Sequence, residues 1–442
     1  MDKSAEVHEG IDEPVHSRQQ MLAIGMAVAA IVPGLALRIG GAHPPDPLAA
    51  LLFGLAIVGS AFLLSWAAEV AQLDISAGLA IAVLAFIAVL PEYAVDLVFA
   101  MKGGNSFEGS GFTNCPAPAG SDESPCSLAL ANMTGANRLL IGVGWTLVVF
   151  LAWRQFKKRG TPEEGKQIQL DRSHAVELSY LALATLYSLF IALRRSITLV
   201  DAAILVALFI AYTIRISRAP AEEPHLVGPA KWIGTFSVPK RRTTVIGLFV
   251  FAGAVILLVA EHFAEALVGS GQSLGVSEFL LVQWLAPLAS EAPELLVAGL
   301  YAIRLNTNNA LGTLVSSKVN QWTLLVGTLP IAFAIASASN HGLPIDAHQR
   351  EELFLTAAQS AFAVAVLINL SMSTREAQLM FGLFITQFIA GAVGPEHIHG
   401  DVRIVTAFIY LTLAAGILWR ERAAIRPLFR DGFRTSYEEL SK

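Results

Sequence analysis

Long uninterrupted apolar blocks are the feature that most constrains how this chain can fold. Each block holds about 20 mainly apolar residues, which is the length that a helix needs to cross about 30 Å of hydrocarbon. Because the runs are continuous rather than alternating, they favour spanning helices over a barrel. The sequence therefore predicts an all-α polytopic membrane protein with about 12 transmembrane helices, near 21–40, 48–70, 76–101, 128–152, 175–193, 197–214, 243–267, 277–302, 310–337, 352–371, 377–394 and 402–419.

Charge is scarce, and its sign is balanced. Only 15% of the residues are charged, whereas soluble domains carry roughly 25%. Lys and Arg number 30 against 35 Asp and Glu, so no basic excess indicates a nucleic-acid partner. No Walker motif is present, so any transport would draw its energy from ion gradients rather than from ATP. We expect a lipid bilayer as the surroundings, no nucleic-acid partner and no enzymatic activity.

Basic loops predict the orientation of the helices. Lys and Arg accumulate in 154–172, in 215–242 and in the tail after 420, whereas the long loop 103–127 contains neither. Since Lys and Arg collect on the cytoplasmic side, twelve helices place both termini inside. We expect a multi-pass protein of the bacterial inner membrane.

The only two cysteines, Cys115 and Cys126, lie in the predicted outer loop. An oxidising compartment would allow them to form a disulfide. Two free thiols are the alternative, and the sequence does not decide between them.

Two of the apolar runs share a Pro-Glu pair near the middle. Pro91-Glu92 lies in the third run and Pro293-Glu294 in the eighth, which also contains Pro287. Proline removes a backbone donor and breaks or kinks a helix. A carboxylate at the bilayer centre costs about 2.5–3.5 kcal/mol on insertion scales. Each glutamate must therefore face a cavity, a partner or an ion.

The helix after each Pro-Glu pair opens with small and polar residues, which makes an internal repeat. In our topology the third run goes from inside to outside and the eighth from outside to inside, so the two units are inverted. Interrupted helices at matching positions of inverted halves indicate a midplane binding site in a secondary transporter. The small and polar residues are Asn132, Thr134, Gly135 and Asn137 in the first unit, and Gly312, Thr313, Ser316 and Ser317 in the second.

We divide the chain accordingly, with two halves of five helices and one extra helix at each end. The parts are a cytoplasmic tail 1–20, an extra helix and loop 21–46, a first half 47–214 with its repeat at about 60–150, a basic cytoplasmic loop 215–242, a second half 243–400 with its repeat at about 250–335, an extra last helix 401–419 and a cytoplasmic tail 420–442.

These motifs resemble the cation/calcium antiporter superfamily, the group of sodium/calcium exchangers. That family has two inverted repeats, each with Gly-Thr-Ser-x-Pro-Glu on one helix and Gly-Asn-x-x-Gly-Ser-Asn/Asp on the next. The resemblance covers the second to eleventh runs. It implies alternating access, transported Ca²⁺, Na⁺, K⁺ or H⁺, and no covalently bound cofactor. It places the central ion and metal ligands at Glu92 and Glu294, surrounded by Asn132, Asn137, Ser290, Ser316 and Ser317.

The chain also departs from the family pattern. Ala88 and Val89 stand where the family has Thr and Ser, and Glu291 replaces the second Ser. Lys318 replaces the terminal Asn or Asp. It could pair with Glu291 or Glu294. A lysine in place of a calcium ligand makes the site poorer for Ca²⁺, which prefers six to eight oxygens.

Residue spacing adds further candidates and alternatives. Asp96 lies four residues after Glu92 and shares its face if the helix has resumed; it could instead mark the end of the ion path. Glu291 is a ligand, a partner of Lys318 or a vestibule residue. The first hypothesis is a cation antiporter of the exchanger type. The alternatives are a proton-coupled monovalent cation antiporter, suggested by Lys318, and a non-transporting relative that acts as a sensor or scaffold.

Overall fold

The computed structural model describes residues 17–74, 90–119, 121–219, 226–393 and 396–440. Helices dominate these residues. Those of the first half are α1 (Ser17–Gly40), α2 (Asp46–Ala71), α4 (Leu90–Gly109), α5 (Pro125–Leu139), α6 (Thr146–Lys158), α7 (Ala175–Ile191) and α8 (Leu199–Ile216). The remainder are α9 (Pro229–Gly234), α10 (Val238–Leu274), α11 (Glu278–Ile303), α12 (Thr307–Asn320), α13 (Val326–Ala336), α14 (Ala347–Val366), α15 (Thr374–Val393), α16 (Glu396–Arg420), α17 (Arg422–Phe433) and α18 (Tyr437–Leu440).

The helical membrane fold is confirmed. Every predicted run coincides with helix in the described residues, the third of them from Leu90 onward. Nine of the described helices are long and apolar enough to cross a membrane, judged by length and composition. The full count of about 12 spans stays a prediction. The predicted outer loop is shorter than expected, because α4 continues to Gly109 and α5 begins at Pro125.

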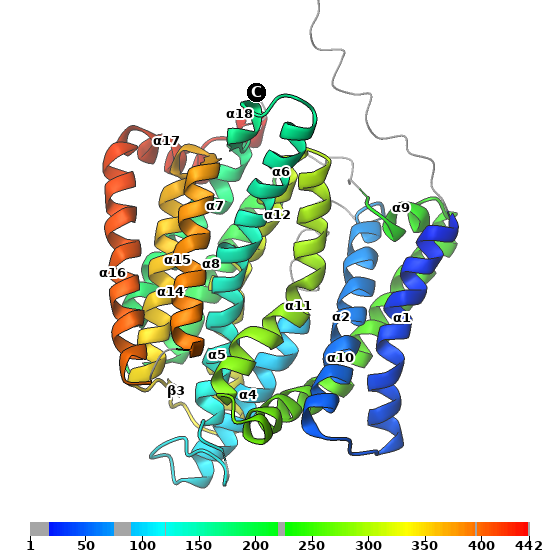
Figure 1. Ribbon diagram of the computed structural model, residues 1–442, viewed down its shortest axis with the longest axis vertical. Helices are drawn as coiled ribbons and strands as arrows, with labels where there is room; N and C mark the ends of the chain where they lie inside the picture. Colours follow the sequence, from blue (N-terminus) through cyan, green and yellow to red (C-terminus); the bar gives the residue numbers. More distant parts are fainter. Residues whose placement is uncertain (1–16, 75–89, 120, 220–225, 394–395, 441–442) are drawn as a thin grey trace, which may run out of the picture.

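The helices form two groups (Figure 1). α1, α2 and α10 lie together, with α2 packed against both of the others. α5 to α8 and α12 to α16 form the larger bundle, and α4 and α11 lie between the groups. The C-terminal end of α6, the short helix α9 and the C-terminus lie at one end of the fold. The loop after α4 lies at the other end. This arrangement is the one that the basic loops predict.

Two short π-helices mark the internal repeat. η1 (Leu140–Trp145) joins α5 to α6, and η4 (Gln321–Leu325) joins α12 to α13. η1 starts three residues after Asn137, and η4 starts three residues after Lys318. These two residues therefore hold the same place in the two units. Such π-bulges occur frequently at functional sites.

Two antiparallel ribbons tie the halves together, and the sequence patterns gave no sign of them. β1 (Gln167–Gln169) pairs with β4 (Ser371–Ser373), and β2 (Ser196–Ile197) pairs with β3 (Leu343–Pro344). The ribbons continue through matching hydrogen bonds, from Leu170 N to the Leu370 carbonyl and from Ile345 N to the Arg195 carbonyl, both at 2.8 Å. The donors are 175 residues apart, and so are the acceptors. Each ribbon thus joins one half to the other at equivalent positions.

The Pro-Glu helices of the two units pack on the other unit. α11 contacts α5, and α4 contacts α13. Pro91 lies within α4, whose described part begins at Leu90. The expected break in the eighth run is wrong, because α11 is continuous through Pro287 and Pro293. Proline still leaves the carbonyl four residues earlier without its helical donor.

That freed carbonyl sits where α11 approaches α5 most closely. Pro287 leaves the Gln283 carbonyl without its helical donor, and a Cβ added at Gly135 would collide with this same oxygen. Glycine is therefore required at 135 because the two backbones touch there.

The disulfide alternative is the one that the structure contains. Cys115 and Cys126 are joined, which ties the loop after α4 to the first turn of α5.

Gly135→Val should lower thermal stability measured in detergent. The side chain would have to enter the backbone contact between α5 and α11, and overpacking of this kind costs about 1–3 kcal/mol. The matched control is Gly382→Val on α15, where an added Cβ has no atom within 4 Å. An equal melting temperature for the two variants would contradict the close approach.

Candidate functional site

The predicted site residues come from four helices that meet between the two groups. α4 and α11 carry the carboxylates, whereas α5 and α12 carry amides, hydroxyls and Lys318. The contacts of α4 with α5 and of α11 with both α5 and α12 bring these faces together. The positions that the family pattern equates, 137 and 318, touch each other directly.

Lys318 is fully buried, and its ammonium group is held by oxygens of the other unit. Nζ donates to the Asn137 carbonyl at 2.7 Å and to Asn137 Oδ1 at 2.5 Å. It also lies 5.2 Å from the centre of the Trp322 ring. The predicted direct pairing with Glu291 or Glu294 is corrected, since among the described residues no carboxylate lies within 4.0 Å of Nζ. Glu291 and Glu92 are its electrostatic neighbours at longer range.

Gln321, the first residue of η4, connects two carboxylates. Its Nε2 donates to Glu291 Oε1 at 2.6 Å, and its side chain is also within hydrogen-bonding reach of Glu92. Both glutamates are buried, with 2% exposure at Glu92 and none at Glu291. Glu92 has Glu294 and Asp96 as further charged neighbours. The structure thus brings Glu92, Glu291 and Glu294 into one electrostatic cluster.

Asp96 joins this cluster from the next turn of α4. It is buried, and Asn132 Nδ2 donates to its Oδ1 at 2.6 Å. The shared face of Glu92 and Asp96 that the four-residue spacing predicts is therefore present, because α4 is already helical at Glu92. Asn132 thus positions Asp96, while Asn137 positions Lys318.

The predicted hydroxyls are arranged differently. Ser290 Oγ bonds to carbonyls of its own helix, those of Ala286 and Pro287, both at 3.2 Å. Ser316 Oγ is paired with the Tyr212 hydroxyl of α8 at 2.8 Å, and Ser317 is partly buried. Ala88 and Val89, the first-repeat departures, lie outside the described residues.

Many buried oxygens in this region have no hydrogen-bond partner among the described residues. A buried acceptor left unpaired costs about 1–3 kcal/mol, so a cluster of them fits a cation or protons. No three His, Cys, Asp or Glu side chains of the described residues converge tightly enough to hold a metal ion as placed. The unpaired atoms are Glu92 Oε2, Asp96 Oδ2, Asn132 Oδ1, Glu291 Oε2, Glu294 Oε2, Asn320 Oδ1 and Gln321 Oε1.

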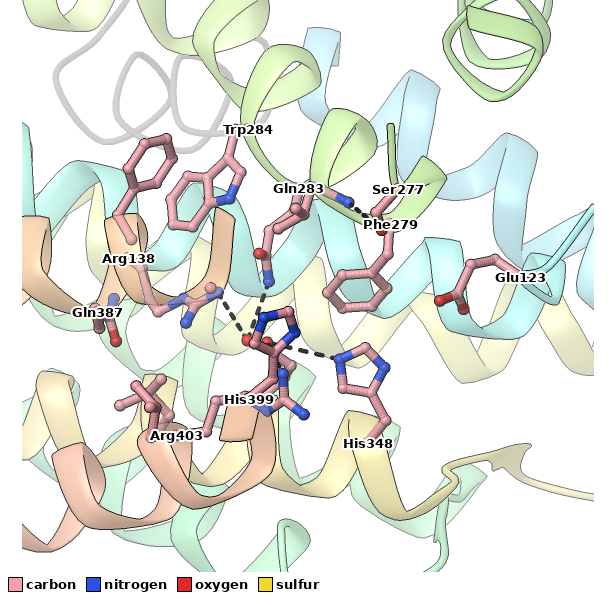
Figure 2. A pocket seen from close by; sticks show the side chains of 16 residues that line it. Glu123, Arg138, Ser277, Phe279, Gln283, Trp284, His348, Gln387, His399 and Arg403 are labelled. Atoms are coloured by element: carbon pink, nitrogen blue, oxygen red, sulfur yellow. Dashed lines mark hydrogen bonds and ion pairs between the residues drawn. The ribbon is translucent and has the colours of Figure 1, made fainter. Parts of the chain in front are cut away.

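A second polar cluster lies beside a cavity of about 250 Å³ between α5, α11, α14, α15 and α16. Figure 2 shows Arg138, Gln283 and His348 directed toward one carboxylate, that of Glu352. Arg138 Nη2 lies 2.7 Å from it and Gln283 Nε2 3.1 Å. Arg138 follows Asn137 in sequence, so α5 contributes to both clusters.

Sequence reasoning missed the role of Glu352. A polar residue within an apolar run predicts a hydrogen bond between helices at Gln321, and the structure has that bond, to Glu291 of α11. The position of Gln321 at the start of a π-helix has no signature in hydropathy. Glu352 begins an apolar run, where a carboxylate ordinarily marks the helix end. Arg138 could have pointed to Glu352, because a buried arginine needs a buried carboxylate as its partner.

The fold and the polar cluster together define a class. Inverted repeats, nine described helices able to cross a membrane, and buried carboxylates on crossing helices are typical of secondary transporters. Residues 45–217 and 244–390 match the family model described as sodium/calcium exchanger protein. The chain belongs to the sodium/calcium exchanger family, whose members are transporters rather than enzymes.

Solved structures agree with this assignment. A crystal structure of the H⁺/Ca²⁺ exchanger CAX is 39% identical, with a TM-score of 0.83, over 96% of this chain and 98% of that one. The structure of native YfkE is 14% identical, with a TM-score of 0.57, over 88% of this chain and 100% of that one, and it supports the fold alone. No curated protein matches the sequence.

Lys318→Met should make the protein's thermal stability more responsive to added Na⁺ or Ca²⁺. The substitution removes the basic group that neighbours Glu92 and Glu291 and competes with a cation for the Asn137 oxygens. A ligand that binds only the folded state then stabilises it by mass action. Lys157→Met, at the exposed end of α6, is the control. Cation-induced shifts in melting temperature equal to those of the unsubstituted protein would rule out a site beside Lys318.

Proposed function

We propose that this protein is a secondary-active antiporter that exchanges a cation, Ca²⁺, Na⁺ or K⁺, against Na⁺ or H⁺ by alternating access. Glu92 and Glu294 act as the central ion ligands. The observation that carries the proposal is the group of buried side-chain oxygens at the crossing of α4, α5, α11 and α12 that find no partner among the residues the structure describes. Such oxygens replace the hydration shell of a cation that enters the membrane.

Asp96, Asn132, Asn137 and Glu291 complete the site in this proposal. Ser290, Ser316 and Ser317 belong to its periphery, since the hydroxyls of the first two are engaged elsewhere. The cation is a transported substrate, so the site must be able to release it. Ligands that lie apart in one conformation favour that release. Closure around the ion then requires α4 and α11 to approach each other, as alternating access demands.

The cluster favours proton coupling over a large sodium stoichiometry. When protonated, Lys318 neutralises part of the negative charge of the neighbouring carboxylates. Fewer positive charges are then needed from the transported ions. The 39% identity with a protein described as an H⁺/Ca²⁺ exchanger supports the same coupling ion. A proton-coupled monovalent cation antiporter is the second candidate, because Lys318 holds two oxygens that a divalent ion would use. The remaining alternative is a non-transporting sensor or scaffold, for which no cation flux is expected.

The basic loops set the proposed orientation. We place both termini in the cytoplasm of a bacterial cell and the disulfide-bonded loop on the outer side of the inner membrane. A disulfide in that loop agrees with an oxidising compartment.

Glu92→Gln and Glu294→Gln should each lower cation flux into proteoliposomes by roughly tenfold or more. Loss of even a partner of a ligating group costs that much in metal affinity. The fluxes are measured separately with Na⁺, Ca²⁺ and pH gradients. Glu108→Gln, an exposed glutamate at the end of α4, is the matched control. Flux unchanged in both site variants would sink the assignment, and absence of flux in the unsubstituted protein would favour the non-transporting alternative.

Lys318→Asp should shift ion preference toward divalent cations or change the pH dependence of transport. The substitution exchanges a cation for a carboxylate beside Glu92 and Glu291, and higher ligand charge favours Ca²⁺ over monovalent ions. The measurement is competition between Na⁺ and Ca²⁺ in the same vesicles across a pH series. If neither property changes, Lys318 lies outside the transport site.

A further inference from the structure

The C-terminal helix α17 carries a row of exposed arginines. Arg422, Arg426, Arg430 and Arg434 recur every fourth residue and are all exposed. Residues four apart lie on one face of a helix, so the four guanidinium groups form a stripe. Arg434 directly follows the last residue of α17 and extends the stripe beyond it.

The opposite face of α17 is buried against the bundle. Leu428 is 4% exposed, and Ile425 and Phe429 pack against the same core. Ser179 Oγ of α7 donates to the Leu428 carbonyl at 3.3 Å. α17 is therefore an amphipathic helix whose apolar face packs mainly against protein, whereas its basic face is exposed.

Polar contacts fix the end of α17 on the turn before α7 and on α8. Arg172 Nη2 lies 2.9 Å from Asp431 Oδ2, and Arg215 Nε donates to the Gly432 carbonyl at 3.1 Å. Burial works against ionisation of Asp431, but hydrogen bonds from Arg172, Thr435 and Arg430 outweigh it and lower the pKa of this carboxyl below its ordinary value. The stripe is thus presented in a fixed geometry, and little ordering entropy is lost when it binds a partner.

The position of α17 points to the membrane surface. α17 begins two residues after the end of α16 and lies across the end of the bundle (Figure 1). Trp419, in the last turn of α16, is 74% exposed, and the Arg422 guanidinium lies 5.3 Å from the centre of its ring. Exposed tryptophans at the ends of membrane helices sit at headgroup level. The stripe therefore starts at the depth of the lipid headgroups.

Charge identifies the partner. Residues 420–434 hold five arginines against Glu421 and Asp431, and Asp431 is turned inward toward Arg172. Basic residues on an amphipathic helix next to a membrane span attract anionic lipids of the cytoplasmic leaflet. Guanidinium groups suit phosphate oxygens because they donate bidentate hydrogen bonds.

We propose that the arginine stripe of α17 (Arg422, Arg426, Arg430 and Arg434) binds the headgroups of anionic phospholipids. The bound lipid clamps the C-terminal segment onto α7 and α8. This proposal does not depend on which ion the protein transports.

The test compares hydrogen exchange of residues 422–440 in nanodiscs of phosphatidylcholine alone and in nanodiscs that also contain phosphatidylglycerol. In the anionic discs we expect exchange to slow by about fivefold or more, and high salt to remove the effect because it screens exposed charges. Replacing all four arginines by Gln should abolish the lipid dependence, whereas replacing them by Lys should retain most of it.

A matched control separates the stripe from general surface charge. Arg154, Lys157, Lys158 and Arg159 form an exposed basic quartet at the end of α6, and their joint replacement by Gln should leave the lipid dependence of 422–440 intact. Equal exchange in the two kinds of disc would overturn the proposal. So would equal loss in both Gln quartets, or slowing by inorganic phosphate in phosphatidylcholine discs, which would indicate a soluble phosphate site.

Discussion

The cost of burying charge in a medium without water governs the centre of this protein. Four carboxylates, Glu92, Asp96, Glu291 and Glu294, lie on helices that hydrocarbon would otherwise surround. Each needs a donor, a counter-charge or an ion, so the helices that carry them cross at the centre. Asn132 and Gln321 supply donors, and Lys318 supplies charge, yet several oxygens stay unpaired. The fold is thus arranged around a set of acceptors that the described part of the chain does not satisfy.

The contact between Lys318 and Asn137 shows how the two repeats have diverged. The residues hold equivalent positions, three residues before each π-helix, but one is an ammonium donor and the other an amide acceptor. Two identical amides could form a hydrogen bond here, but neither of them would be basic as Lys318 is. The asymmetry gives one repeat a basic side chain whose amine is held by oxygens of the other repeat. An internal duplication has in this way become an interaction between unlike partners.

Much of the fold could be predicted from sequence, because hydropathy records which segments can face lipid. The Pro-Glu pairs and the repeat were also accessible, since proline and buried acids are rare in membrane helices. The π-helices and the ribbons could not be predicted. The ribbons pair residues that are far apart in sequence, such as Gln167 with Ser373 and Ser196 with Pro344. A π-helix forms from local hydrogen bonds, but it leaves no mark in hydropathy. Continuity of α11 through two prolines was likewise unpredictable, because neighbouring helices decide whether a proline bends or breaks a helix.

The candidate site was predicted at the level of residues rather than contacts. Glu92, Glu291, Asp96 and Lys318 do cluster, since a repeat places its polar positions at the same depth. The partner of Lys318 was wrong, because sequence gives no information on side-chain direction. Ser290 and Ser316 were assigned from the family pattern, but hydroxyls in apolar helices readily bond to nearby carbonyls or to another hydroxyl.

The two ribbons have a consequence for mechanics. β1 and β4 pair at one end of α7 and α14, and β2 and β3 pair at the other end of these helices. In each ribbon, one strand comes from the first half and the other from the second half. α7 and α14 are also linked between them, through Thr185 and Ser360 hydroxyls 2.8 Å apart. α7 and α14 are thus joined at both ends and in the middle, which favours their moving as one unit. The movement that alternating access requires is then expected at α1, α2, α4, α10 and α11, which no ribbon of the described residues joins.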